Sequence, residues 1–121
     1  MENYRLVMPE HLNHFGFLFG GYLLQWVDEI SFMATTMAYP GCRFVTIGMD
    51  EVEFRKSVRK GTILRFQVDC ITRGTTSVKS QVDVSREDIE SGTIESIFST
   101  TVTFVRVDEK GKKQKLPTHA N

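Results

Sequence analysis

Residues 22–38 read YLLQWVDEISFMATTMA, a run without glycine or proline, and Pro40-Gly41 follows after one further residue. A run of this length is too long for a typical strand and normal for a helix, and proline with glycine is typical of a helix end. Apolar side chains occupy nearly every side of this helix, which indicates that the rest of the protein encloses most of it. The sequence therefore predicts one long buried helix at residues 22–38.

The chain after Gly41 changes to the pattern of β-strands. Its apolar residues alternate with polar ones, and the pairs Lys60-Gly61, Arg73-Gly74 and Ser91-Gly92 are typical of turns between strands. A short strand and an ordered loop rich in glycine, histidine and phenylalanine precede the helix. We expect the loop at residues 9–21 and strands at residues 3–8, 44–54, 62–72, 77–85 and 94–107.

One helix combined with one antiparallel sheet belongs to the α+β class. We expect a five-stranded antiparallel sheet wrapped around one long central helix, in a single domain that covers residues 1–121. One sheet of this size cannot surround such a helix completely. The apolar surface and the sheet edge that remain therefore predict pairing with a second copy of the chain.

The overall charge and hydropathy exclude several classes of protein. Fifteen basic residues balance fifteen acidic ones, whereas nucleic-acid binding favours a strongly basic face. No apolar run approaches the roughly 20 residues that span a bilayer, and residues 1–5 lack the apolar core of a signal peptide. We therefore expect a cytoplasmic protein with Cys42 and Cys70 as free thiols and without nucleic-acid or membrane partners.

The residues before and inside the predicted helix could carry chemistry. Gly20-Gly21 leaves the first backbone N–H groups of the helix uncovered, and these groups with the helix dipole favour an oxyanion. Asp28 follows in an apolar helix, where a buried carboxylate is costly but is tolerated if it acts as a base or nucleophile. Structural interpretations also exist, because the glycines could form only a turn, Asp28 could face solvent, and Asn13 could be a turn or cap residue.

His11 and His14 are the only pair of residues that suggests a metal site. No third ligand stands at a recognisable zinc spacing from them. We therefore expect no metal and no resident cofactor.

These residues taken together resemble a known family. Asn13-x-x-Gly16-x-x-Phe19-Gly20-Gly21, with Met8-Pro9 before it and Asp28 after it, resembles the signature of the YciA-type acyl-CoA thioesterases in the hot-dog fold superfamily. Gly74-Thr75-Thr76-Ser77-Val78 resembles the strand-turn-strand motif of that family, and Lys110-Gly111-Lys112 up to Leu116-Pro117 resembles its C-terminal end. The resemblance covers nearly the whole chain.

The resemblance implies the hot-dog fold and the hydrolysis of acyl-CoA to a free acid and CoA, with CoA only as part of the substrate or product. It implies that Asp28 is the catalytic carboxylate, as general base or nucleophile, and that Asn13 positions the water or the carbonyl. It further implies that the amides of Gly20 and Gly21 polarise the thioester carbonyl. A hexamer arranged as a trimer of dimers is implied as well.

Basic side chains at two turns are candidates to bind the CoA phosphates. The family has its CoA contacts near these turns, although such charges are also typical of a solvated surface. The candidate CoA-binding residues are Arg55, Lys56, Arg73, Gly74, Thr75, Thr76 and Ser77.

The spacing between the glycines and Asp28 predicts a site shared between two protomers. Seven helical residues span about 10 Å, so a thioester held at Gly20-Gly21 could not also touch Asp28 of the same helix. We therefore expect Asn13 and the two glycines from one protomer and Asp28 from its neighbour.

A plain structural dimer remains open, although Asp28 in an apolar helix argues against it. Two other functions remain open as well. One is a non-catalytic acyl-CoA binding or sensing module, although such regulators usually carry a DNA-binding segment, for which this chain has no room. The other is a hot-dog hydratase or dehydratase, which pairs a histidine with a carboxylate at the helix, whereas no histidine occurs between Gly21 and His119. The length of the acyl chain stays open, and from composition we expect its pocket to be lined by Phe15, Phe17, Trp26, Phe32 and Met33.

Overall fold

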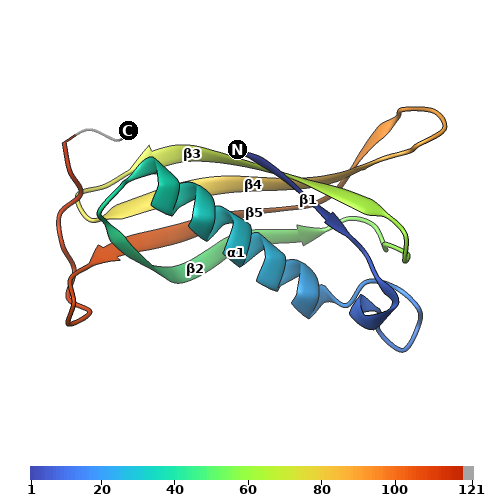
Figure 1. Ribbon diagram of the computed structural model, residues 1–121, viewed down its shortest axis with the longest axis horizontal. Coiled ribbons are helices and arrows are strands. Elements are labelled where there is room, and N and C mark those ends of the chain that lie inside the picture. The colour runs from blue at the N-terminus through green and yellow to red at the C-terminus, as the bar shows by residue number, and fades with distance from the viewer. Residues whose placement is uncertain (119–121) are drawn as a thin grey trace.

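The computed structural model describes residues 1–118, which form a five-stranded antiparallel sheet with one long helix on it (Figure 1). The predicted strands are present, with ends that differ from the predicted ones by at most two residues. The elements are β1 (Glu2–Leu6), the 3-10 helix η1 (Pro9–His11), α1 (Gly20–Ala38), β2 (Arg43–Phe54), β3 (Ile63–Arg73), β4 (Ser77–Glu87) and β5 (Ile94–Val107).

The strands lie in the order β1-β3-β4-β5-β2, and every neighbouring pair is antiparallel. Strands β3, β4 and β5 follow one another along the chain and in the sheet. Strand β2 instead lies beside β5, so β2 and β3 are not neighbours although they follow one another along the chain. The edges of the sheet are therefore β1 and β2.

Helix α1 lies across one face of the sheet (Figure 1). It begins at Gly20, two residues earlier than predicted, so the two glycines form its first turn and do not precede it. The prediction that most of the helix is enclosed is wrong for the single chain. Only one face is buried, whereas Phe32 is exposed and Met37 is 65% exposed.

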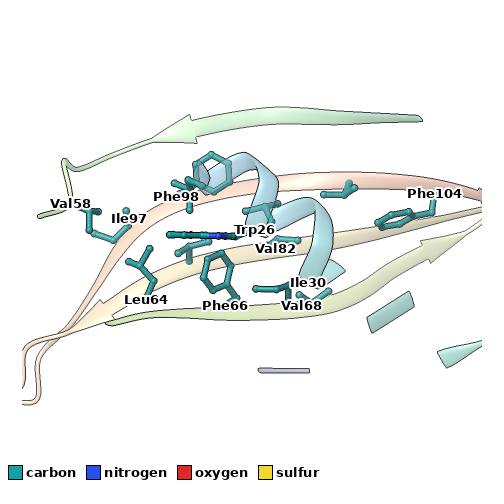
Figure 2. Packing of buried hydrophobic residues seen from close by; sticks show 14 of the residues in the cluster. Trp26, Ile30, Val58, Leu64, Phe66, Val68, Val82, Ile97, Phe98 and Phe104 are labelled. Atoms are coloured by element: carbon teal, nitrogen blue, oxygen red, sulfur yellow. The ribbon is translucent and has the colours of Figure 1, made fainter. Parts of the chain in front are cut away.

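The core lies between α1 and the sheet, and most of its side chains come from the strands, while the helix adds Leu23, Trp26, Val27 and Ile30. Trp26 and Ile30 of α1 pack among Leu64, Phe66 and Phe98 of the sheet (Figure 2). Figure 2 also shows that the ring of Phe104 lies apart from this group, further along β5. The densest aromatic packing therefore supports the beginning of α1.

Strand β2 has an exposed and irregular edge. Its register with β5 shifts between Thr46 and Gly48, at Ile47, which is 61% exposed, and shifts again between Asp50 and Glu53. An exposed apolar edge strand offers unpaired backbone groups to another chain. This edge and the apolar residues left uncovered on α1 agree with the predicted pairing of two copies.

Two further predictions concern thiols and membranes. Cys42 and Cys70 are both free, as expected. Within residues 1–118, no helix combines the length and the apolar character needed to cross a membrane.

Candidate active site

The loop before α1 is shaped by the side chain of Asn13. Its Oδ1 accepts the backbone N–H groups of Phe15 at 2.9 Å and Phe17 at 3.2 Å. Its backbone N–H also donates to the Phe17 carbonyl at 2.7 Å, and Gly16 completes the turn with φ +87°. In the described part of the chain the Nδ2 group of Asn13 has no acceptor, so it is available to donate to a ligand.

The first turn of α1 presents free donors. The residues before it are tied to neighbouring segments, because the Leu18 N–H donates to the Val58 carbonyl and the Phe19 N–H to the His11 carbonyl. The N–H groups of Gly20 and Gly21 have no acceptor among residues 1–118. Two free N–H groups at the positive end of a helix favour a negatively charged or polarised oxygen.

Asn13 and Gly20 line the same open groove, together with Arg55 and Lys56. The ring of Phe54 lies over the helix start, 3.5 Å from the position where a Cβ on Gly20 would stand. The other walls of the groove are mainly apolar. The structure therefore brings the predicted catalytic residues Asn13 and Gly20 into one groove with Arg55 and Lys56, which were predicted to bind CoA.

Asp28 lies on α1 at the side that faces β2. The hydroxyl of Thr46 donates to its Oδ1 at 2.6 Å, and the carboxylate is half-buried. Glu29 faces elsewhere and accepts a hydrogen bond from Gln25 at 2.8 Å, as the helical rotation between the two carboxylates requires. The sequence pattern predicts no catalytic role for Thr46, although Val45-Thr46 begins a stretch that resembles the second strand of the YciA-type family.

One chain does not unite Asp28 with the groove. Asp28 is eight residues after Gly20, which corresponds to about 12 Å along the helix axis. It does not line the groove that contains Asn13 and Gly20. Both halves of the expected chemistry are therefore present in the chain, but they lie at separate places.

The residues expected to bind CoA fall into two groups at opposite ends of the sheet. Arg55 lies near the beginning of α1, where its guanidinium donates to Glu53 at 2.9 Å and to the Ser99 hydroxyl at 2.7 Å. Arg73 lies at the β3–β4 turn, donates to the Pro117 carbonyl and stacks on the ring of Tyr39, which follows the end of α1. This turn lies at the end of the sheet where α1 ends (Figure 1). The two groups therefore do not form a single site within one chain.

The β3–β4 turn itself is well ordered by backbone bonds. The Gly74 N–H donates to the Ser77 carbonyl at 2.8 Å, which closes the turn. The carbonyls of Thr75 and Thr76 accept N–H groups of the C-terminal segment and of β5, at 2.9 and 2.8 Å. Its exposed side chains are thus held at the end of the sheet away from the groove.

The five residues expected to line an acyl pocket do not meet in one place. Phe15 and Phe17 line the groove beside Asn13. Trp26 is buried in the core, Phe32 packs near Phe104 at a ring distance of 6.3 Å, and Met33 packs on the core from the helix. Composition alone could not separate core aromatic residues from groove aromatic residues.

Comparison with known proteins places this geometry in a family. The thioesterase superfamily matches residues 15–93 of the chain. The chain is 30% identical to the acyl-CoA thioester hydrolase YciA of Escherichia coli over 93% of its own length and 86% of that protein. It is 32% identical to the uncharacterized acyl-CoA thioester hydrolase YkhA of Bacillus subtilis and 30% identical to mouse acyl-coenzyme A thioesterase 11. The match to YkhA includes 92% of this chain but only 64% of YkhA. The match to the mouse protein includes 93% of this chain but only 19% of that protein.

Solved structures agree with the sequence relatives. An acyl-CoA hydrolase from Staphylococcus aureus, in complex with butyryl-CoA and CoA, superimposes with a TM-score of 0.89 at 29% identity, over 97% of this chain and 71% of that one. Cj0915 of Campylobacter jejuni, a hexameric hotdog fold thioesterase, gives a TM-score of 0.85 at 30% identity, over 95% and 88% of the two chains. With the family match, the sheet topology and the groove at the start of α1, the chain belongs to the thioesterase superfamily and has the hot-dog fold.

Proposed function

We propose that this protein is an acyl-CoA thioesterase, which hydrolyses acyl-CoA to a free acid and CoA. The observation that carries the proposal is the groove that Asn13 and Gly20 line together, at the helix start where the N–H groups of Gly20 and Gly21 are free. A carboxylate with a fixed orientation, Asp28, completes the set of groups that thioester hydrolysis requires. The names of the E. coli and S. aureus proteins support the same activity.

The chemistry follows from these groups. The thioester oxygen accepts hydrogen bonds from the Gly20 and Gly21 N–H groups, which stabilise the negative charge that develops on it. Asp28 takes a proton from water as the water oxygen attacks the carbonyl carbon. The C–S bond then breaks, and the CoA thiolate takes up the proton. Attack by Asp28 itself, followed by hydrolysis of the anhydride, gives the same products.

Thr46 acts on the orientation of the carboxylate. Its hydroxyl occupies Oδ1 of Asp28 at 2.6 Å, which leaves Oδ2 for water or substrate. Hydrogen bonds to an ionised acceptor are shorter and stronger than bonds between neutral groups. Variants of the S. aureus hydrolase with a single aspartate, asparagine or threonine changed to alanine have been solved, and this chain has the same three residue types in its two half-sites.

A second copy of the chain supplies the missing half of the site. Asn13 and Gly20-Gly21 of one protomer act with Asp28 of its neighbour, because about 12 Å of helix separates them within one chain. The exposed edge of β2, with Val45 and Ile47, is the surface that the neighbour covers. A dimer is the minimum assembly, and a hexamer built as a trimer of dimers agrees with the hexameric state of Cj0915.

The CoA site, like the catalytic site, lies between two copies of the chain. Lys56 and Arg55 lie beside the groove, whereas Arg73 with residues 74–77 reaches the CoA phosphates from another protomer. Guanidinium and ammonium groups are the usual partners of phosphate. The protein works in the cytoplasm on acyl-CoA and needs no resident cofactor.

The activity is tested by thiol release from acyl-CoAs of increasing chain length, with wild type and the variant Asp28→Asn. Loss of a general base lowers kcat by about 10²- to 10⁴-fold, so the variant should be nearly inactive. Glu29→Gln is the matched control, because it removes the neighbouring carboxylate of the same helix and should retain activity. A folded, oligomeric wild type that binds acyl-CoA without hydrolysing any would contradict the proposal and favour a binding module.

The shared site is tested separately by mixing two inactive variants. Asn13→Asp keeps the acceptor oxygen for the loop but removes the Nδ2 donor, and Asp28→Asn removes the base. Co-assembled dimers should recover about a quarter of wild-type activity, since half of them contain one intact site of two. A mixture as inactive as its components would place all groups of one site on a single chain.

A further inference from the structure

A second cavity lies under the C-terminal half of α1, away from the groove. Its volume is about 330 Å³, and its walls include Ala34, Thr35 and Ala38 of the helix and Val68, Cys70 and Ser80 of the sheet. The two alanines explain why it exists. Small side chains on the helix face above β3 and β4 leave space that Trp26 and Ile30 fill further back along the helix.

The walls of this cavity are apolar apart from a few groups. Thr35 is 4% exposed, and its Oγ1 has no hydrogen-bond partner among the described residues. The Ser80 side chain, also buried, and the Cys70 thiol lie on the opposite wall. A buried hydroxyl without a partner is unfavourable, and apolar walls with a few polar groups are typical of a ligand site.

The cavity stands at a defined distance from the expected catalytic carboxylate. Thr35 follows Asp28 by seven residues, which places it about 10 Å further along the helix and only about 20° around it. Ser31 lies between them on the same helix face, where it is fully buried and its hydroxyl donates to the Val27 carbonyl at 2.7 Å. An extended chain advances about 3.3 to 3.6 Å for every three bonds, so about nine bonds cover this distance.

We propose that this cavity receives the far end of the substrate's acyl chain, and that the preferred acyl chain has about ten carbon atoms and a hydroxyl group at that end. The Thr35 hydroxyl then gains the partner that it lacks, by donating to or accepting from the hydroxyl of the substrate. Met1 and Met37 also line the cavity, and their flexible thioether side chains can move aside as the chain enters. This inference rests on the proposed function.

The kinetic test compares decanoyl-CoA with 10-hydroxydecanoyl-CoA, which differ only by the terminal oxygen. Wild type should have the higher kcat/KM for the hydroxylated substrate, and the isosteric variant Thr35→Val should lower the ratio of the two values about tenfold. Thr35→Ser retains the hydroxyl and should restore the ratio. A ratio that is the same in wild type and Thr35→Val, with both folded, would overturn the proposal.

A second measurement is independent of catalysis. Free 10-hydroxydecanoic acid should slow the alkylation of Cys70 in the wild-type protein, because the thiol lines the cavity. Cys42 is the internal control, since it lies outside this cavity in the same molecule and should react at an unchanged rate. Protection of Cys70 without hydrolysis of any thioester would refute the proposed function but keep the ligand site, whereas equal reactivity with and without the acid would refute the site.

Discussion

The two halves of α1 differ in how they meet the sheet. The half from Gly20 to Ile30, the packed half, inserts Leu23, Trp26 and Ile30 into the core. In the half from Ser31 to Ala38, the loose half, the small side chains of Ala34, Thr35 and Ala38 leave a cavity above the sheet. The first half carries the groups expected to act on the thioester, and dense packing fixes such groups in place. The second half leaves free volume of about 330 Å³ between the helix and the sheet, where we propose that the end of the acyl chain binds. Under the two proposals, one helix separates the positioning of the reaction from the recognition of the substrate.

Removal of the largest side chain from the packed half should have the largest effect. Trp26→Ala should lower the free energy of unfolding by about 3–5 kcal/mol, because the cavity it leaves lies among residues that cannot collapse onto it. Met37→Ala on the loose half is the matched control and should change it by less than about 0.5 kcal/mol, since Met37 is mostly exposed. Urea unfolding of both variants provides the measurement. Similar losses would show that the two halves are equally packed in the assembled protein.

The sequence predicted the elements of this fold better than their arrangement. The absence of helix breakers in residues 22–38 predicted α1, but its true start at Gly20 could not be predicted, because glycine has a low helix propensity and tertiary contacts extend the helix. The pairing of β2 with β5 was also beyond reach, since alternation along a strand does not specify its neighbour.

For the candidate site too, individual residues were easier to predict than the contacts between them. Asn13, the glycines and Asp28 were selected from motif and spacing, and the structure shows the free donors and the groove that such roles need. Their roles remain predictions. Thr46 was missed because its contact with Asp28 joins two elements 18 residues apart, and no local pattern records such a contact.

Loss of the hydrogen bond between Thr46 and Asp28, near the boundary between the two halves of α1, should have the next largest effect. Thr46→Val removes the 2.6 Å hydrogen bond to Asp28 while it keeps the shape of the side chain. A hydrogen bond to a charged group is worth about 1.5–3 kcal/mol, so kcat should fall roughly 10- to 150-fold. The acyl-CoA preference should not change, because the cavity lies further along α1. Thr46→Ser should restore much of kcat. If Thr46→Val changed the acyl-CoA preference and left kcat unchanged, the two halves of α1 would not have separate roles.

Two buried hydroxyls on the loose half should respond to removal in opposite directions. Thr35→Val replaces a hydroxyl that has no partner, so it should raise the free energy of unfolding by about 1 kcal/mol. Ser31→Ala removes a hydroxyl bonded to the Val27 carbonyl, so it should lower that free energy by about 1 kcal/mol. Thermal or urea unfolding without ligand separates the two. Destabilisation by Thr35→Val would mean that the Thr35 hydroxyl already has a partner in the folded protein.

The smallest changes in stability should come from substitutions in the first turn of α1. An alanine at Gly20 places its Cβ 3.5 Å from the Phe54 ring, an ordinary contact, so Gly20→Ala should gain about 0.5–1 kcal/mol of stability from helix propensity. At Gly21 the Cβ would stand 2.7 Å from the ring of Phe19, which must rotate and thereby offsets the gain. Gly20→Ala should nevertheless lose thioester hydrolysis, because the added methyl group projects where the groove begins. The free energy of unfolding and kcat should be measured for both Gly20→Ala and Gly21→Ala. A stabilised but inactive Gly20→Ala would show that this glycine serves the reaction at a cost in stability. A stabilised and active Gly20→Ala would show that it does not.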